Sequence, residues 1–266
     1  MSLPHPSPGT RAVVTGASSG IGEALAESLA RRGHSLVLVA RRADRLARLA
    51  ERLSTSYLVE VDVEVVDLAD RSQRSAFVER LRDVDVSVLC LNAGFATYGR
   101  LLDLDAEREL EQVELNVNAV HHLLVALLPA LVARGDGAVL ITGSTAGNQP
   151  SPCNATYAAT KAFANTLAES VGGELKGTGV SCTLLAPGPV RTEFAATSEL
   201  GALERHIPDV AWVSAERAAE SALRGLASRR RRVVPGLTSR IQDVGGRLAP
   251  RSLVIPMLHR VYGSGR

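Results

Sequence analysis

The sequence predicts an α/β protein made of one large domain. Short apolar runs alternate with helical patterns from about residue 11 to residue 234, which is typical of this class. The length of 266 residues suits one such domain better than two small ones. The 45% hydrophobic content is enough for a substantial core, which must be aliphatic because aromatic residues make up only 3%.

A glycine-rich turn follows the first predicted strand, Arg11–Thr15, and precedes a helix that we expect from Ile21 to Arg32. Glycines let the backbone turn sharply and approach a pyrophosphate, and the helix N-terminus attracts the anion. The alternative is a helix that simply begins after a glycine turn. The position at the first strand–helix junction favours a dinucleotide site. Its predicted cofactor-binding residues are Gly16, Ser18, Ser19, Gly20, Ile21 and Gly22.

Two arginines stand between the second predicted strand, Ser35–Ala40, and a helix expected over Ala43–Leu53. In dinucleotide folds an acidic residue at this junction binds the ribose 2′-hydroxyl of NAD. Here the junction has Arg41 and Arg42 and no carboxylate, and two guanidiniums can hold a 2′-phosphate through charge-assisted hydrogen bonds. The junction therefore favours NADP(H). The alternative is that both arginines form a solvated helix start.

The next two predicted strands also end in candidate cofactor residues. The third strand, Tyr57–Val66, ends at Asp67 and Leu68. Asp67 could accept a hydrogen bond from an adenine amino group, or it could cap a helix expected over Ala69–Leu81. The fourth strand, Val86–Leu91, ends in a turn of small residues that would let a cofactor pack closely. The residues of this turn are Asn92, Ala93 and Gly94.

An amphipathic pattern over Ala106–Ala133 predicts two helices, the second starting near Gln112. Asn116 and a second asparagine two residues later lie inside that second helix. Asparagine lowers the propensity of a helix interior. We therefore expect a functional reason for at least one of the two.

Tyr157 and Lys161 lie four residues apart in a helix expected from about Thr156 to Gly172. That spacing stacks both side chains on one face, where the ammonium should lower the pKa of the Tyr157 phenol toward neutrality. Lys161 is one of two lysines among 30 Lys and Arg residues, and its compact charge could also reach a ribose hydroxyl. Ser144, after the predicted strand Ala138–Thr142, would complete a catalytic cluster. Tyr-x-x-x-Lys also arises by chance, so its weight depends on the N-terminal glycines.

A segment of weak pattern, Glu193–Val213, follows the sixth predicted strand, Val180–Leu185, and the turn that begins at Pro187. Such a long connection is often a lid. We interpret His206 within it as a surface or pocket-wall histidine and not as a general base. The predicted pocket walls are mostly apolar and suit a hydrophobic ketone or an acyl chain. They are Phe95, Tyr98, Gln149, Cys153, Val190, Phe194 and Trp212.

The C-terminal part begins with a helix capped by Ser214 and ends in an extension of unassigned role. Four consecutive arginines, Arg229–Arg232, precede a short final strand near Val233-Val234. They could be a solvated turn, or they could bind a phosphate-bearing ligand or an acidic partner. Residues 236–266 should form a helical extension interrupted by prolines. It could pack on the substrate cleft, on another subunit or on a membrane surface.

The composition argues against several classes of protein. A net charge of +2 with mixed acids and bases argues against a nucleic-acid surface. Cys90, Cys153 and Cys182 show no metal spacing, so we expect no metal site and a reducing, cytoplasmic location. Residues 1–10 have no apolar h-region and should form a disordered tail. No uninterrupted apolar segment looks long enough to span a bilayer.

Taken together and in order, these motifs identify a resemblance to the short-chain dehydrogenase/reductase family over about Arg11–Val234. They comprise the turn Thr15–Gly22, Asn92-Ala-Gly, Asn116, Ser144, Tyr157-x-x-x-Lys161 and Pro187-Gly188. Two positions depart from the usual pattern. Leu91 replaces a first asparagine before Asn92, and Thr142-Gly143 precedes Ser144 where a second serine is common.

The resemblance implies a single-domain Rossmann fold: a doubly wound, seven-stranded parallel sheet in the order 3-2-1-4-5-6-7, with helices on both faces. It also implies cofactor-binding roles for Pro187, Gly188, Val190 and Thr192, with Thr192 at the carboxamide end of the nicotinamide. Family members are often dimers or tetramers.

The resemblance also implies the catalytic roles. Tyr157 would exchange a proton with the substrate oxygen, Ser144 would stabilise that oxygen, Lys161 would lower the pKa of Tyr157, and Asn116 would hold a water that relays protons to Lys161. Two other readings stay open. One is a non-catalytic nucleotide-binding regulator, and the other is a membrane-surface or scaffold protein acting through its tail.

Overall fold

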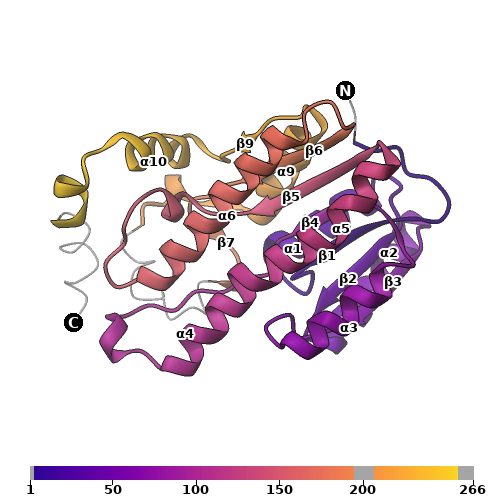
Figure 1. Ribbon diagram of the computed structural model, residues 1–266, viewed down its shortest axis with the longest axis horizontal. Helices are drawn as coiled ribbons and strands as arrows, with labels where there is room; N and C mark the ends of the chain where they lie inside the picture. Colours follow the sequence, from indigo (N-terminus) through magenta and orange to yellow (C-terminus); the bar gives the residue numbers. More distant parts are fainter. Residues whose placement is uncertain (1–2, 195–206, 257–266) are drawn as a thin grey trace.

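The computed structural model describes residues 3–194 and 207–256. Helices and strands alternate along the chain as the sequence predicts (Figure 1). The strands are β1 (Thr10–Thr15), β2 (Leu36–Ala40), β3 (Val61–Val65), β4 (Asp85–Leu91), β5 (Gly137–Thr142), β6 (Val180–Leu185), β7 (Val190–Arg191), β8 (Val213–Ser214) and β9 (Arg232–Val233). The α-helices are α1 (Gly20–Ala30), α2 (Ala43–Tyr57), α3 (Arg71–Leu81), α4 (Ala106–Val113), α5 (Val120–Arg134), α6 (Ala155–Glu174), α9 (Ala215–Ala227) and α10 (Leu237–Leu248).

Seven strands form one sheet in the order β3-β2-β1-β4-β5-β6-β9, and all neighbouring strands are parallel. This confirms the predicted order, with β9 in the seventh place. β7 and β8 pair separately in a two-stranded sheet. Because the strands are parallel, the residues that follow them gather at one edge of the sheet.

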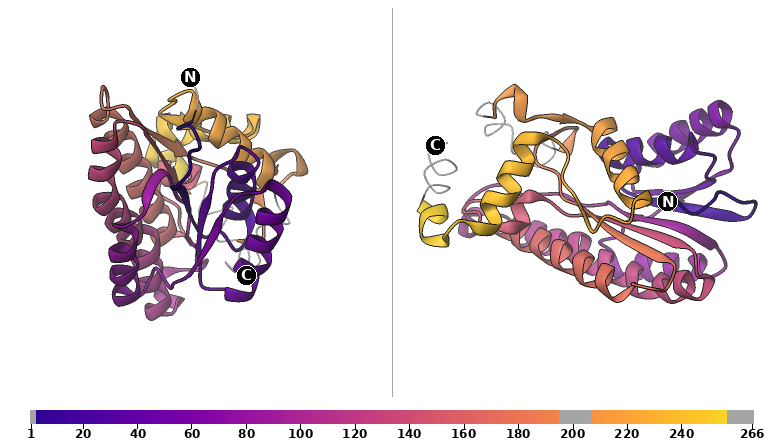
Figure 2. Two further views of the ribbon diagram at one scale, coloured as in Figure 1. Left: turned by 90° about the vertical axis from the view of Figure 1, so that its right-hand side faces the viewer. Right: turned by 90° about the horizontal axis from the view of Figure 1, so that it is seen from above.

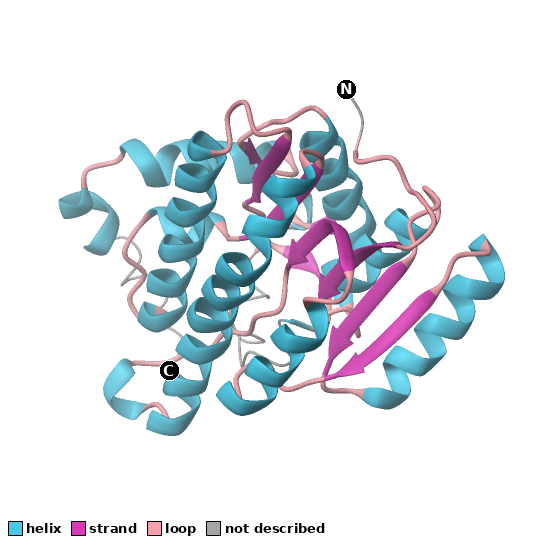
Figure 3. Ribbon diagram, turned by 45° about the vertical axis from the view of Figure 1, so that its right-hand side comes forward, coloured by secondary structure: helices cyan, strands magenta, loops and turns pink. Residues whose placement is uncertain are grey.

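Helices cover both faces of the sheet, as the two rotated views and the secondary-structure colouring show (Figures 2 and 3). The core on one face joins the sheet to α3, α5 and α6, with Phe77 and Leu123 fully buried within it. The core on the other face joins the sheet to α1, α2 and α9, with Leu25 and Leu223 buried. Phe77 is the one aromatic residue among the buried members of these two cores, as the low aromatic content predicts.

The third strand is shorter than the sequence suggested. α2 continues to Tyr57, and Leu58 then ends the helix in the left-handed conformation with φ 55°. β3 therefore begins only at Val61. The prediction that the strand begins at Tyr57 was wrong. Tyr57 favours strands, but it directly follows helical residues and forms the last residue of α2.

The long helical pattern is one continuous rod and not two helices. α4 runs without a break into a π-helical segment, Glu114–Ala119, and then into α5. Over Ala106–Arg134 this rod is long and apolar enough to cross a membrane by length and composition, although charged residues interrupt its sequence. Its buried residues instead pack on β4 and β5, as expected for a core helix.

The N-terminal residues differ from the expected disordered tail over 1–10. Thr10 begins β1, and its hydroxyl donates to the backbone oxygen of Ser7 at 2.9 Å. Leu3 packs against the core beside α1. The described part of the tail is therefore held on the domain.

The last described helix, α10, has an unusual distribution of side chains. Its buried residues are the polar Ser239 and Asp243. Its exposed hydrophobic residues form a stripe at helical spacing: Leu237, Ile241, Val244 and Leu248. α10 thus rests on the domain through its polar face. It lies at the end of the molecule near α6 (Figure 1).

Candidate active site

A cavity of about 570 Å³ opens at the carboxyl ends of the central strands. It brings together the glycine-rich turn, the Arg41-Arg42 junction and the Ser-Tyr-Lys cluster, which lie far apart in the sequence. The predicted site residues that line it are Gly16, Ser18, Ser19, Gly20, Ile21, Arg41, Arg42, Asp67, Leu68, Asn92, Ala93, Gly94, Phe95, Ser144, Tyr157, Lys161, Pro187, Gly188, Val190, Thr192, Phe194 and Trp212.

Glycine is required at two positions of the first turn. Gly16 has φ 69°, and a Cβ there would lie 2.9 Å from the Cα of Ala93. A Cβ on Gly22 would lie 2.1 Å from the Gly16 oxygen. Gly22 does not line the cavity; it lets α1 pack directly on the turn. The glycines therefore leave an open concave backbone in front of the α1 N-terminus.

Arg42 faces this turn. Its Nε and Nη2 donate to the Ser18 hydroxyl at 3.0 and 2.9 Å, and Nη2 also donates to the Ser19 hydroxyl at 2.7 Å. Its Nη1 pairs with Glu193 at 3.1 Å, and Arg45 pairs with the same carboxylate at 2.6 Å. These two arginines lower the pKa of Glu193, Arg45 more strongly. The sequence analysis missed Arg45, although it lies one helical turn after Arg42.

Arg41 has different partners. Its Nη1 lies 3.0 Å from Glu111 and 3.6 Å from Asp67. Asp67 also accepts from the backbone N–H of Ala69 at 3.0 Å, so it fixes its own turn, while Asp70 caps α3. The two predicted arginines are therefore not equivalent. Arg41 pairs with Glu111 and Asp67, whereas Arg42 donates to Ser18 and Ser19 of the glycine-rich turn.

The turn after β4 is tied to β1 by one hydroxyl. Thr15 Oγ1 accepts from the backbone N–H groups of Asn92 and Ala93 at 2.9 and 3.0 Å, and it donates to the Cys90 oxygen at 3.2 Å. Thr142 donates to the Asn92 side chain at 3.2 Å. The ends of β1, β4 and β5 are thus held in register beneath the cavity.

α6 carries Tyr157 and Lys161 into the same cavity. Lys161 Nζ lies 5.7 Å from the centre of the Tyr157 ring and donates to the Thr142 backbone oxygen at 2.9 Å. Ser144 caps the short 3₁₀ helix Thr145–Asn148 by accepting from the Ala146 N–H at 3.1 Å. Three of the four predicted catalytic residues, Ser144, Tyr157 and Lys161, therefore line one cavity.

The ionisation of the cluster differs from the sequence reading. Burial raises the pKa of Tyr157 to about 12, although the neighbouring Ser144 hydroxyl lowers it. Burial also lowers the pKa of Lys161 to about 8. The expected fall of the Tyr157 pKa is therefore wrong for the protein alone, because loss of water at the deep end of the cavity disfavours both charged forms.

Asn116 lies behind the cavity wall, in the π-helical segment. Its Nδ2 donates to the Phe95 oxygen at 2.9 Å and to Thr160 Oγ1 at 3.1 Å, while its Oδ1 accepts from the Phe95 N–H at 3.1 Å. A Cβ on Gly94 would lie 2.8 Å from Asn116 Oδ1 and 3.4 Å from Lys161 Nζ. Asn116 thus fixes the Phe95 backbone, and Gly94 keeps the space between Asn116 and Lys161 open.

Asn165 is a residue that the sequence analysis missed. Its Oδ1 accepts from the Ser144 N–H at 3.3 Å, and its Nδ2 donates to the Ser144 oxygen at 2.9 Å. A signal was present, because Asn165 follows Lys161 by four residues and so extends the Tyr157–Lys161 face of α6. An asparagine buried inside a helix holds the backbone of Ser144.

Only some of the residues predicted to contact the substrate line the cavity. Phe194 lies at a ring-centre distance of 5.8 Å from Tyr157. Tyr98, Gln149 and Cys153 do not line this cavity. Cys153 has φ 61°, so the chain turns here, and Gln149 lies instead beneath Gly246 of α10. Wall residues that the analysis missed are Arg108, Asn154, Ile207 and Gln242. His206 and most of the predicted lid lie outside the described residues.

The residues present fit a dinucleotide. The glycine cradle faces the α1 N-terminus, whose N-cap residue, Ser19, makes no side-chain cap. An anion there would meet unpaired first-turn N–H groups and the Arg42 guanidinium. Among the described residues, no group of three or more His, Cys, Asp or Glu side chains is arranged to hold a metal ion.

Comparison with known proteins gives consistent matches. The family model described as "short chain dehydrogenase" matches residues 10–201. An uncharacterized oxidoreductase of Staphylococcus epidermidis is 36% identical over 191 residues, covering 71% of this chain and 82% of the relative.

Two solved structures are also similar. A short-chain dehydrogenase from Sphingobium yanoikuyae in complex with NADPH is 33% identical, with a TM-score of 0.81 over 93% of this chain and 95% of that one. A short-chain dehydrogenase/reductase from Burkholderia phymatum in complex with NAD is 26% identical, with a TM-score of 0.80 over 93% of this chain and 95% of that one.

Proposed function

This chain belongs to the short-chain dehydrogenase/reductase family, and from that premise we propose that it is an NADP(H)-dependent oxidoreductase that interconverts a carbonyl and a secondary alcohol. The observation that carries the proposal is the shared cavity. One space holds the glycine-rich turn and, beyond it, Ser144, Tyr157 and Lys161. A cofactor held on the turn would therefore reach the groups that handle a substrate oxygen.

The protein's own groups suit proton transfer at that oxygen. The dinucleotide, when bound, supplies or accepts the hydride. A phenol with a pKa of about 12 is protonated at neutral pH, so Tyr157 begins reduction as the proton donor. The Lys161 ammonium stabilises the phenolate that remains, and the Ser144 hydroxyl donates to the oxygen as charge develops. In oxidation the same groups act in reverse. We also propose that Asn116 holds a water in the space beside Gly94, and that this water relays protons to Lys161.

The substrate end of the cavity suits an apolar compound. Phe95, Phe194 and Trp212 contribute aromatic surface, and Val190 and Ile207 contribute aliphatic surface. Burial of apolar surface is the main source of affinity for such walls. We propose a hydrophobic ketone or an acyl-type substrate.

We also propose a preference for NADP(H). Arg42 is held against the serines of the glycine-rich turn, and no carboxylate follows β2 directly. The related structures bind NADPH in one case and NAD in another, so family membership alone does not decide the choice.

The test is a panel of ketones, aldehydes and 3-oxoacyl thioesters, followed through NADPH absorbance beside an NADH control. Turnover in the wild type and its loss in Tyr157→Phe would support the proposal. Tight NADPH binding without turnover on any compound would favour the alternative, a non-catalytic nucleotide-binding regulator on the same fold.

The apolar stripe of α10 favours a second proposal, contact with a membrane surface. Leu237, Ile241 and Leu248 are each more than half exposed, and the nearby Arg240 and Arg247 are exposed cations. This combination fits an anionic lipid surface. The protein would be a peripheral membrane protein. We propose a cytoplasmic location, which is in keeping with its three free cysteines.

Vesicle sedimentation tests this second proposal. Wild-type protein should bind phosphatidylserine vesicles, whereas Ile241→Ser/Leu248→Ser should not. Equal recovery of both proteins with the vesicles, or of neither, would contradict it.

A further inference from the structure

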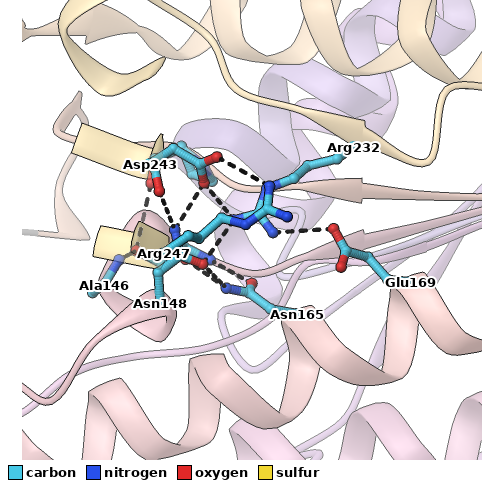
Figure 4. A network of polar contacts seen from close by, with 9 residues as sticks. Ala146, Asn148, Asn165, Glu169, Arg232, Asp243 and Arg247 are labelled. Atoms are coloured by element: carbon cyan, nitrogen blue, oxygen red, sulfur yellow. Dashed lines mark hydrogen bonds and ion pairs between the residues drawn. The ribbon is translucent and has the colours of Figure 1, made fainter. Parts of the chain in front are cut away.

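Arg232 differs from the other three arginines of its run. Arg229, Arg230 and Arg231 are exposed, which agrees with a solvated turn. The side chain of Arg232 is only 13% exposed, and it pairs with the carboxylate of Asp243 on α10 (Figure 4). Its other contacts are Glu169 Oε1 at 3.1 Å and Asn148 Oδ1 at 2.8 Å. The end of the arginine run therefore anchors the C-terminal helix.

Asn148 connects this ion pair to the active site. Its Nδ2 donates to Asp243 Oδ1 at 2.8 Å and to the Asp243 backbone oxygen at 3.3 Å. Its Oδ1 accepts from Arg232 and, at 3.2 Å, from Asn165 Nδ2. Asn165 in turn holds both backbone groups of Ser144. An unbroken series of hydrogen bonds thus runs from α10 to Ser144, and Figure 4 shows its central part.

Burial makes this series rigid. Asp243 is 5% exposed and Asn165 is 5% exposed, so water cannot replace a broken contact cheaply. A Cβ on Gly143 would lie 2.0 Å from Asn165 Oδ1, which shows how closely the Asn165 side chain fits against the chain before Ser144. A side chain held in this way keeps a catalytic group in place.

α10 also reaches the other side of Ser144. A Cβ on Gly188 would lie 2.4 Å from Ser239 Oγ, so α10 packs directly on the loop at Pro187-Gly188. The Ser144 hydroxyl lies 3.4 Å from the Pro187 oxygen. The helix therefore contacts both segments that surround the Ser144 hydroxyl.

We infer that Asp243 and Arg232 are positioning residues for Ser144, so that the C-terminal helix forms part of the catalytic apparatus. The inference rests on the proposed function for its kinetic consequence, but the contacts themselves do not. Asp243 on α10 orders Asn148, Asn148 orders Asn165, and Asn165 fixes the backbone that carries the hydroxyl. The matched family region ends at residue 201, whereas these two residues lie beyond it.

The test is a double-mutant cycle in the full-length protein. Asp243→Asn should lower kcat about tenfold, because small displacements of a catalytic group are costly, and should leave the NADPH dissociation constant within about twofold. In a Ser144→Ala background the same change should alter kcat less than about twofold, because no hydroxyl remains to be placed. A tenfold loss in both backgrounds would mean a general structural effect and would overturn the inference.

Two further variants keep the cycle decisive. Asn148→Ala leaves the Asp243–Arg232 pair in place and so keeps α10 docked, but it removes the contacts that link this pair to Asn165. It should therefore give a comparable loss of kcat that also disappears in Ser144→Ala. Asp62→Asn breaks a more exposed aspartate–arginine pair, with Arg11 at 2.8 Å, toward the opposite edge of the sheet. It should leave kcat unchanged, and a similar loss in this control would overturn the inference.

Hydrogen exchange separates this inference from the proposed function. In Asp243→Asn, amide exchange of the segment 143–149 should accelerate at least several-fold, while the β5 segment 138–142 keeps its protection. This readout needs no substrate. Unchanged exchange at 143–149 would overturn the positioning chain, whereas absence of turnover in the wild type would overturn only the proposed function.

Discussion

Lys161 is buried and Tyr157 is half-buried, and their pKa values shift in opposite directions, each toward the uncharged form. The phenol keeps its proton to a pKa of about 12, and the ammonium loses its proton near 8. Their spacing in the sequence indicates that they meet, but it cannot report the depth at which they meet. The cost of dehydration is therefore visible only in the fold.

Tyr157→Phe should abolish proton transfer while keeping the cavity shape. We expect turnover to fall by a factor on the order of 10² or more, the low end for general acid–base catalysis, with the NADPH dissociation constant unchanged. Steady-state kinetics and fluorescence titration measure the two quantities. Near-normal turnover in this variant would remove Tyr157 from the catalytic role.

Lys161→Met should stabilise the fold and abolish activity. The pKa of Lys161 is lowered from 10.5 to about 8, so between these values the unfolded chain binds more protons than the folded one and stability rises with pH. At pH 7 the burial of the charge costs about 3–4 kcal/mol, at roughly 1.4 kcal/mol per pKa unit. The methionine variant also loses the hydrogen bond from Lys161 to the Thr142 backbone oxygen, which reduces the gain in stability by about 1 kcal/mol.

The net effect of Lys161→Met should be a Tm a few degrees higher at pH 7, shrinking toward pH 10. Thermal unfolding at several pH values measures it. Lys161→Arg keeps the cation and serves as the comparison, which should show no gain. A lower Tm for the methionine variant at pH 7 would contradict this account.

At the scale of elements, the proposed preference for NADP(H) can be tested at the junction of β2 and α2. Arg42→Ala should weaken NADPH binding by about tenfold to a hundredfold, since one charge-assisted bond is worth roughly 1.5–3 kcal/mol and ~1.4 kcal/mol is tenfold. Arg41→Ala should weaken it less, because Glu111 and Asp67 already engage that guanidinium. NADH binding should change little in either variant, and binding titrations with both cofactors measure the difference.

Glu193→Gln is the matched control at this junction, because it removes the carboxylate that Arg42 and Arg45 hold. NADPH should bind several-fold more tightly to it. Equal wild-type affinity for NADH and NADPH, or a full NADPH preference in Arg42→Ala, would refute this reading of the arginines.

The sequence predicts those elements whose signal is local. The order of strands and helices, the glycine turn and the Tyr157–Lys161 face follow from spacing and composition. The link from Asn165 to Ser144 does not, because it depends on how α6 packs across the end of β5. Gln149 and Cys153 were misplaced for a similar reason, since the left-handed turn at Cys153 redirects the loop.

At the scale of the whole molecule, the exposed side of the α4–α5 rod suits a second subunit. Leu110 and Val125 are 61% and 57% exposed there. A symmetric dimer or tetramer would cover such a face. We expect sedimentation at micromolar concentration to show an oligomer, and Leu110→Asp/Val125→Asp to give monomers.

Leu58→Asp serves as the control for the oligomer test. Leu58 is 91% exposed at the end of α2, away from the α4–α5 rod, so its replacement by a charge should leave the assembly intact. A wild-type protein that sediments only as a monomer would contradict the prediction, and so would dissociation of the Leu58 variant.

The polar underside of α10 gives that helix its own thermodynamic signature. The heat capacity of unfolding and the denaturant m-value both grow with the apolar surface that becomes exposed. α10 rests on the domain through Ser239 and Asp243, so its detachment would expose little such surface. We therefore expect α10 to detach from the domain in an early step of unfolding. In calorimetry this step should have a small heat capacity change, and in urea it should have a small m-value. Cooling, which weakens hydrophobic contacts, should therefore not loosen α10.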